Sequence, residues 1–190
     1  MVRVNVSGAR VAVIGTEVPW VEAAALYLGA QQIVTLEWRD LELQDPKIKV
    51  LHPIEAAKNW RSLEPFDYIL SFSSLEHSGL GRYGDPLSPW DDLVEVRKYR
   101  CLLKINGALI VGLPISKDTI NYNAHREYGA IRLPLLFAVG FELEHFFADN
   151  DPQDNIAQLN IAMMDNYKKQ PVMVMRKTMW TTGERVIEPV

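Results

Sequence analysis

Short apolar runs alternate with longer mixed segments along most of the chain. Branched apolar residues fill positions 11–14, 33–36 and 108–113, and these runs end at a glycine, a glutamate and a proline respectively. Runs of this length and composition are typical of strands buried on both faces of a sheet. The predicted strands span residues 11–14, 33–36, 48–51, 66–72, 108–113, 141–147 and 171–176.

The segments between several of these runs have the features of helices. Pro19 suits a first helical turn, because its missing N–H would have no partner there, and Gly29 suits the C-terminal cap of the same helix. Ser88, Pro89 and Asp91 resemble a capping box at the start of another helix. The predicted helices cover residues 19–28, 53–60, 88–103 and 132–139.

Strands and helices that alternate with short connections predict an α/β protein. The expected fold is a Rossmann-like three-layer sandwich with a mostly parallel sheet of up to seven strands. A chain of 190 residues suits one domain, residues 1–190. Residues 150–169 are either a helix or a long loop.

The composition limits the class of protein and the cellular location that we expect. Hydrophobic residues make up 48% and charged residues 23%, and no window approaches the roughly 20 apolar residues of a membrane span. The first residues read into a strand rather than a signal peptide, so a cytoplasmic location is expected. The single cysteine, Cys101, excludes an internal disulfide and is expected to be packed within its helix.

The net charge is −4, and no run of basic residues stands out. The sequence therefore does not predict electrostatic binding to nucleic acid or to an anionic membrane. A small molecule is therefore the expected partner. The assembly state is left open, a homodimer included.

Residues 66–86, FDYILSFSSLEHSGLGRYGDP, carry the main candidate chemistry. An apolar strand over residues 66–72 runs directly into a loop rich in glycine and polar side chains. In open α/β sheets, ligands bind beyond the carboxyl ends of the strands. This loop is therefore the first place to look for a site.

The first two strands end with a glycine and an acid, a pattern that suits a nucleoside-containing cofactor. Glu37 follows Gly15 by 22 residues, close to the roughly 20 expected for a carboxylate that accepts hydrogen bonds from ribose hydroxyls. A dinucleotide fingerprint would need further glycines where Glu17 and Trp20 stand. NAD and FAD are therefore disfavoured.

Four phrases in order, VAVIG, VTLEW, FDYILSFSSLEH and LLKINGALIVGLP, resemble the class I S-adenosylmethionine-dependent methyltransferases. More narrowly, SSLEHSGLGRYGDP and NAHREYGAIRLPLL are similar to the Caenorhabditis protein of unknown function family. The resemblance covers roughly residues 10–176.

The resemblance implies S-adenosylmethionine as cofactor. It places Gly15 and Glu17 at the start of the cofactor loop, Glu37 at the ribose position, and Ser73 in the segment that contacts cofactor and substrate. The sequence departs from the pattern after the third strand, where Leu51, His52 and Pro53 occupy a place often held by an acidic residue that contacts adenine.

Methyl transfer needs alignment and, for a hydroxyl or amine acceptor, removal of a proton. His77 is the candidate base, Glu76 could orient it, and His125 would approach the same crevice. The candidate substrate-binding residues are Arg82, Tyr83, Asp85, Asn123 and Arg126.

Each of these residues also has a structural interpretation. Glu76 and His77 could cap a turn, and His125 with Arg126 could form an ion-paired loop anchor with Asp85 or Glu127. Residues 82–85 could order a glycine-rich lid, and no compact metal-ligand motif is present. Two functions are therefore carried forward: a small-molecule methyltransferase whose base is a histidine, or a degenerate methyltransferase-like domain that binds another ligand or a protein without catalysis.

Overall fold

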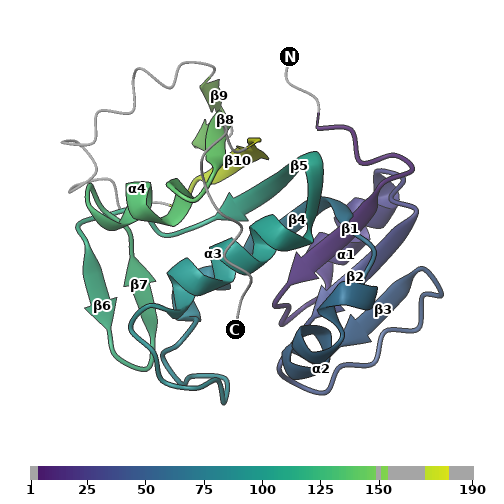
Figure 1. Ribbon diagram of the computed structural model, residues 1–190, viewed down its shortest axis with the longest axis horizontal. Helices are drawn as coiled ribbons and strands as arrows, with labels where there is room; N and C mark the ends of the chain where they lie inside the picture. Colours follow the sequence, from purple (N-terminus) through teal and green to yellow (C-terminus); the bar gives the residue numbers. More distant parts are fainter. Residues whose placement is uncertain (1–3, 149–150, 154–169, 180–190) are drawn as a thin grey trace.

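A computed structural model describes residues 4–148, 151–153 and 170–179. Its main sheet has eight strands in the order β3-β2-β1-β4-β5-β10-β8-β9 (Figure 1). The first five in this order are mutually parallel, β10 is antiparallel to β5 and β8, and β9 is antiparallel to β8. The strands are β1 Arg10–Ile14, β2 Gln32–Leu36, β3 Ile48–Leu51, β4 Phe66–Phe72, β5 Leu103–Gly112, β8 Phe141–Ala148, β9 Asp151–Gln153 and β10 Val172–Lys177.

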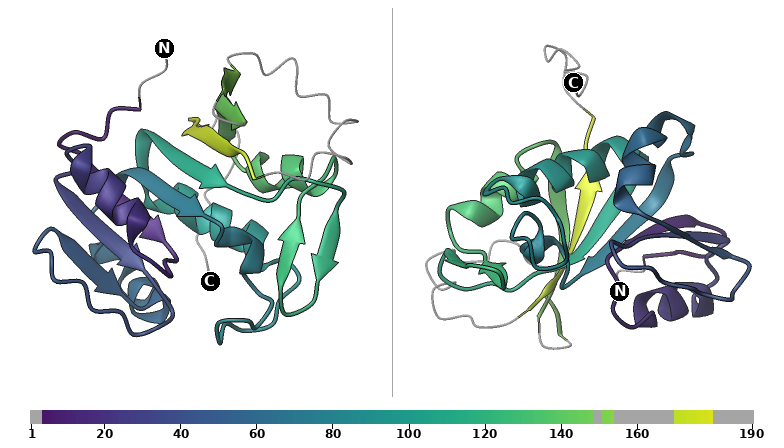
Figure 2. Two further views of the ribbon diagram at one scale, coloured as in Figure 1. Left: turned by 180° about the vertical axis from the view of Figure 1, so that it is seen from behind. Right: turned by 90° about the horizontal axis from the view of Figure 1, so that it is seen from below.

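Helices cover both faces of this sheet, and a separate hairpin lies beside it. Figure 2 shows α1 on one face and α2 and α3 on the other. The hairpin β6–β7 follows β5 in the chain. The remaining elements are α1 Trp20–Tyr27, α2 Pro53–Lys58, η1 Trp60–Ser62, η2 Leu75–His77, α3 Asp91–Leu102, β6 Thr119–Asn121, β7 His125–Glu127 and α4 Arg132–Phe137.

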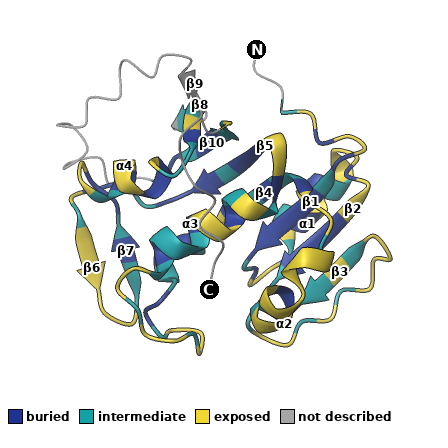
Figure 3. Ribbon diagram, viewed as in Figure 1, coloured by how far each residue is buried: buried dark blue, intermediate teal, exposed yellow. Residues whose placement is uncertain are grey.

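The core is divided by the central strands, which are buried along most of their length (Figure 3). Alternate residues of a strand point to opposite faces. In β1, Val11 and Val13 pack with Ala25 of α1, while Ala12 and Ile14 belong to the larger cluster that includes Val96 of α3. The Rossmann-like three-layer sandwich predicted from the sequence is confirmed.

Several boundaries differ from the prediction. The third helix begins at Asp91 rather than Ser88, because Ser88 Oγ accepts the N–H of Trp90 at 3.4 Å in a turn that precedes the helix. The following strand starts at Leu103, since residues 104–107 bulge out of the ladder around Asn106 at a φ of 64° instead of ending it.

Other features were absent from the prediction or contrary to it. The hairpin β6–β7 was not among the predicted elements. β9 is an eighth strand where at most seven were predicted, and it lies within the segment left as helix or loop, of which residues 150 and 154–169 are outside the described part. Cys101 is exposed, so the expectation of a packed thiol was wrong. Among the described helices, none has the length and apolar character needed to cross a bilayer.

Candidate functional site

The carboxyl ends of β1 and β4 meet at the centre of the sheet, where the chain leaves one strand for α1 and the other for α3. Gly15, directly after β1, has a φ of +67° and donates its N–H to Leu36 O at 2.9 Å. A Cβ at Gly15 would lie 2.3 Å from Ser74 Oγ, in the connection after β4. The two connections therefore touch at the switch point of the sheet, which is where a crevice was predicted from the sequence.

Glu37, at the end of β2, is buried and already bound on both oxygens. Its Oε2 accepts the N–H of Thr16 at 2.7 Å, and its Oε1 accepts the N–H of Arg39 at 3.0 Å. The guanidinium of Arg39 lies 3.4 Å from Oε1 and donates to Thr16 O at 2.7 Å. The carboxylate thus ties the first connection to β2 at the position expected of a ribose ligand.

A second buried acid, Glu22, supports the same connection and was not singled out in the sequence. It accepts the hydroxyl of Thr35 at 3.0 Å and that of Thr16 at 3.4 Å. Burial raises its pKa. Its spacing of three residues from the buried Ala25 places both on the sheet-facing side of α1, which is the pattern that could have revealed it.

Aromatic side chains border this part of the edge. Trp20 and Phe72 form an edge-to-face pair with ring centroids 5.1 Å apart, and both are partly exposed. Trp38 and His52, which follow β2 and β3, form a second such pair at the same separation. Glu17 lies exposed on the first connection. A carboxylate that accepts hydrogen bonds, beside aromatic faces that can stack on a base, suits a nucleoside.

The connection after β4 holds a differently built acid. Ser73, at a φ of 51°, donates its hydroxyl to Glu76 Oε1 at 2.8 Å. Glu76 is 1% exposed, and its Oε2 has no hydrogen-bond partner within the described part of the chain. Burial raises the pKa of Glu76 to about 7. This carboxyl can therefore hold or release a proton near neutral pH.

His77 lies beside Glu76 with its two ring nitrogens in different surroundings. Nδ1 is 2.5 Å from Ala124 O, and Nε2 is 3.9 Å from Glu76 Oε1. A carbonyl oxygen only accepts, so Nδ1 carries the hydrogen and Nε2 of the neutral ring keeps its lone pair. Burial lowers the pKa of His77, and Arg82 and His125 add to that effect. A neutral imidazole with a free Nε2 has the form of a general base.

Two of the predicted neighbours contact the His77 ring. Tyr83 packs against it edge-to-face at 5.5 Å, and His125 at 6.3 Å between centroids. The guanidinium of Arg82 lies 5.6 Å from the centre of the Tyr83 ring, and His125 Nε2 lies 3.6 Å from Glu127 Oε1. The structure thus brings His77, Tyr83 and His125 together.

Asp85 and Asn123 occupy structural positions. The Asp85 carboxylate accepts the backbone N–H of Gly79 at 2.6 Å, Gly81 at 3.4 Å and Tyr83 at 3.3 Å, so it orders the glycine-rich loop. Asn123 lies exposed in the β6–β7 turn at a φ of 53°, a left-handed conformation that asparagine tolerates well.

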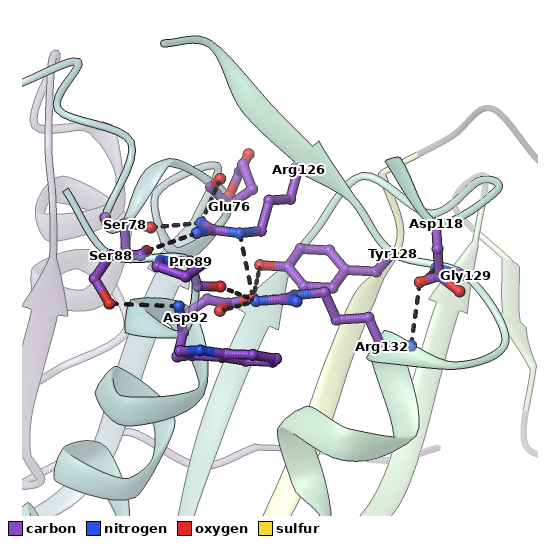
Figure 4. Close-up of polar contacts among 12 residues, drawn as sticks. Glu76, Ser78, Ser88, Pro89, Asp92, Asp118, Arg126, Tyr128, Gly129 and Arg132 are labelled. Carbon is purple, nitrogen blue, oxygen red and sulfur yellow. Dashed lines mark hydrogen bonds and ion pairs between the residues drawn. The ribbon is translucent and has the colours of Figure 1, made fainter. Parts of the chain in front are cut away.

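Arg126 is fully buried, so its guanidinium does not line an open crevice. It donates to the carbonyls of Ser78 and Ser88 and lies 3.8 Å from Asp92 Oδ2 (Figure 4). The loop anchor considered from the sequence is present in outline, but the acid beside Arg126 is Asp92 rather than Asp85 or Glu127. His125 does pair with Glu127.

Asp92 is the centre of a buried network that the sequence did not reveal. It accepts Arg132 Nε at 2.8 Å, Arg132 Nη2 at 2.6 Å and the Tyr128 hydroxyl at 3.1 Å. The hydrogen bond from Arg132 to Asp92 raises the pKa of Arg132. Asp118 caps α4 next to this network by accepting the N–H groups of Gly129, Ile131 and Arg132. Only the acidic first turn of α3 hinted at Asp92.

Metal ligands are not gathered here: the described residues contain no group of three histidine, cysteine or acidic side chains that could hold an ion. A groove of about 740 Å³ lies elsewhere, beside α2, and its lining includes Arg10, Lys49 and Lys58. The candidate site is therefore defined by the strand ends and their connections rather than by that groove.

Comparisons with known proteins show the family and the fold of this chain. A family model described as "Caenorhabditis protein of unknown function, DUF268" matches residues 8–178. A search of curated proteins finds no match.

Several solved structures with a similar fold are methyltransferases. The S-adenosylmethionine dependent methyltransferase of Mesorhizobium loti is 14% identical, with a TM-score of 0.60 over 91% of this chain and 93% of that one. A TehB-like SAM-dependent methyltransferase of Corynebacterium glutamicum is 15% identical, with a TM-score of 0.58 over 90% and 82%. The 1,6-didemethyltoxoflavin-N1-methyltransferase of Burkholderia thailandensis, solved with S-adenosylhomocysteine, is 16% identical, with a TM-score of 0.54 over 91% and 72%. The chain therefore has the class I methyltransferase fold.

Proposed function

Because this chain belongs to the Caenorhabditis protein of unknown function family, DUF268, and has the class I methyltransferase fold, we propose that it is a small-molecule methyltransferase that uses S-adenosylmethionine. The observation that carries the proposal is the meeting of three connections at one sheet edge. Gly15 touches Ser74, and His77 touches Ala124 and His125. Residues that bind the cofactor and a residue that accepts a proton can thus lie next to each other.

The residues at the ends of β1, β2 and β3 suit the nucleoside half of the cofactor. Each Glu37 oxygen has more than one lone-pair direction, so ribose hydroxyls can add to the N–H groups already bound. Trp38 and His52 offer aromatic surface beside it. Exposed Glu17 adds a carboxylate that would attract the positive charges of the methionine half. When bound, S-adenosylmethionine supplies an electrophilic methyl group.

The residues after β4 suit the acceptor. His77 would take the acceptor proton at Nε2, because Ala124 O holds the hydrogen at Nδ1. The resulting imidazolium would face the Glu76 carboxyl 3.9 Å away, and an ionised Glu76 would stabilise it. Tyr83 and His125 border the same ring and would exclude water from it.

Calorimetric titration with S-adenosylmethionine and with S-adenosylhomocysteine tests the proposal. We expect saturable binding of both ligands to the wild type, and at least tenfold weaker binding to Glu37→Ala. Glu42→Ala is the matched control, since Glu42 is exposed and is not among the residues proposed to bind the cofactor. Trp38→Ala provides a second variant that leaves the Glu37 hydrogen bonds in place, and it should also lose affinity.

One observation favours the second candidate, a methyltransferase-like domain that binds another ligand or a protein without catalysis. Ser74 closes the space over Gly15, and Glu37 takes the N–H of Thr16, so the first connection presents fewer free donors than a glycine-rich loop would. If neither ligand gives heat on titration at millimolar concentration, the methyltransferase proposal is excluded and only this second function remains.

A further inference from the structure

Arg126 holds the segment that carries Glu76 and His77. Its Nη1 donates to the carbonyls of Glu76 and Ser78, and its Nη2 donates to Ser88 O at 3.2 Å. These carbonyls lie at the two ends of the loop that joins η2 to α3 (Figure 4). One buried side chain therefore fixes both ends of the loop to β7.

The same hairpin also contacts the imidazole itself. Ala124, two residues before Arg126, provides the carbonyl that binds Nδ1 of His77. That carbonyl belongs to the turn between Asn121 and His125, in which Ala124 donates its N–H to Asn121 O at 3.0 Å. The hairpin thus sets both the backbone position of His77 and the tautomer of its ring.

We propose that Arg126 is a positioning residue for His77: the hairpin β6–β7, fastened through the Arg126 guanidinium, holds the imidazole with Nδ1 on Ala124 O and Nε2 directed away from the hairpin. This rests on the proposed function in so far as His77 is the base, but the placement of the ring is a property of the fold and can be measured without any reaction.

The charges around Arg126 argue for positioning rather than for stability alone. Arg126, Arg132 and Asp92 are all mostly or fully buried, and removing three charges from water is costly even when they are paired. Arg126 Nε has no hydrogen bond within the described residues, only the 3.8 Å approach to Asp92. Arg132 makes the close two-point contact with Asp92, so Asp92 has a strong partner besides Arg126. The distinct contribution of Arg126 is its set of loop carbonyls.

Arg132 therefore offers a matched control. Arg126→Lys and Arg132→Lys both keep a cation beside Asp92 and lose the planar fork of donors. Only the first loses the simultaneous bonds to the carbonyls on both sides of His77, whereas Arg132 binds Pro89 O and Asp92. We expect the two variants to lose similar amounts of stability, whereas only Arg126→Lys should change the state of the His77 ring.

The experiment is a nitrogen-detected NMR titration of the histidine side chains in the full chain, with His77→Gln used to assign the His77 signals. Wild type should show a single Nδ1–H tautomer. In Arg126→Lys we expect mixed tautomers, because the hairpin no longer fixes Ala124 O at Nδ1. Arg132→Lys should leave the single tautomer unchanged. Glu76, Arg82, Asp85 and His125, which face the ring, remain the same in both variants.

An unchanged His77 in folded Arg126→Lys, or an equal change in Arg132→Lys, overturns the proposal. Should Arg126→Lys fail to fold, the exposed turn supplies a second pair: Asn123→Val disfavours the left-handed φ of 53° and should disturb the Nδ1 bond, whereas Asn123→Gly should keep it. A wild-type tautomer in folded Asn123→Val contradicts the role of the hairpin.

The two proposals fail in different ways. If neither S-adenosylmethionine nor its product binds but Arg126→Lys changes His77, the positioning stands and the methyltransferase function falls. If both ligands bind and turnover is found, Arg126→Lys should lower kcat at least tenfold with KM nearly unchanged, and Arg132→Lys should not.

Discussion

Glu37 and Glu76 are both buried carboxylates at the same edge of the sheet, yet their surroundings are opposite. Glu37 receives N–H groups from Thr16 and Arg39 and lies against a guanidinium. Glu76 accepts the hydroxyl of Ser73 on Oε1, and its Oε2 has no hydrogen-bond partner within the described structure. The first acid has hydrogen-bond donors on both oxygens, whereas the second has an oxygen without a partner among the described residues and a raised pKa, so it can exchange a proton near neutral pH.

This difference divides the edge into two regions. The region around β1 and β2 packs closely at Gly15 and Ser74, and its Glu37 and the aromatic pair of Trp38 and His52 are the groups proposed to hold a nucleoside. The region around η2 has a carboxyl with a raised pKa and an imidazole with a lowered one, and it suits proton transfer. Pairs of titratable groups with pKa values displaced in opposite directions are typical of acid–base sites.

The largest effect is expected for His77→Ala. If the η2 region carries out proton transfer, this variant should lower kcat about 10²- to 10⁴-fold, because a general base is lost, and leave cofactor affinity nearly unchanged. Turnover assays and calorimetry measure the two. His145→Ala, in β8, serves as control. Wild-type turnover in His77→Ala would remove His77 from the mechanism.

Glu76→Gln should change the dependence of stability on pH. The folded pKa of about 7 lies above the ordinary value of 4.5, so the wild type is most stable while Glu76 is protonated and loses stability as pH rises from 4.5 through 7. The neutral amide avoids this loss. At pH 8 we expect the variant to be more stable than wild type by up to about 3 kcal/mol, with no such gain near pH 4.5.

Denaturant unfolding across this pH range measures the Glu76 effect. Glu42→Gln removes the same charge from an exposed site and should show no comparable gain at pH 8. A constant difference between Glu76→Gln and wild type from pH 4.5 to 8 would contradict the raised pKa.

Gly15→Ala tests the closed packing of the first region. The new Cβ would lie 2.3 Å from Ser74 Oγ, and the alanine would have to keep the left-handed φ of Gly15. We therefore expect the free energy of unfolding to fall by about 2 to 3 kcal/mol. Gly84→Ala is the matched control, because Gly84 has a φ of +86° but open space around it. It should lose only about 1 kcal/mol. Equal losses would show that the Gly15–Ser74 contact is unimportant.

The smallest change is expected for Glu37→Gln, and its sign should be opposite to that of Glu76→Gln. The amide cannot accept from Thr16 and Arg39 on both ends, so stability at pH 8 should fall by about 1.5 kcal/mol. Thermal or denaturant unfolding at pH 8 measures it. A gain of stability would place Glu37 in the same class as Glu76 and would end the distinction between the two regions.

Much of the fold and part of the site could be predicted from the sequence. Period and composition located the strands, and the order of the elements brought Gly15, Glu37 and Ser73 to one edge, where the structure has them. The roles of Asp85 and Arg126 could not be predicted in this way, because an acid or arginine in a glycine-rich segment looks the same whether it faces a ligand or binds backbone. The three N–H groups on Asp85 and the full burial of Arg126 decided that question.

The sequence by itself determined the alternation of strands and helices, since apolar periodicity is local and each strand carries its own pattern. It also determined that polar groups follow the first, second and fourth strands. Only the tertiary structure decided which of those groups are already bonded. Burial and hydrogen-bond partners depend on residues far apart in the chain, such as Ala124 against His77 or Asp92 against Arg126. Those long-range contacts separate Glu37 from Glu76, two glutamates that look equivalent when each is read only with its neighbours in the chain.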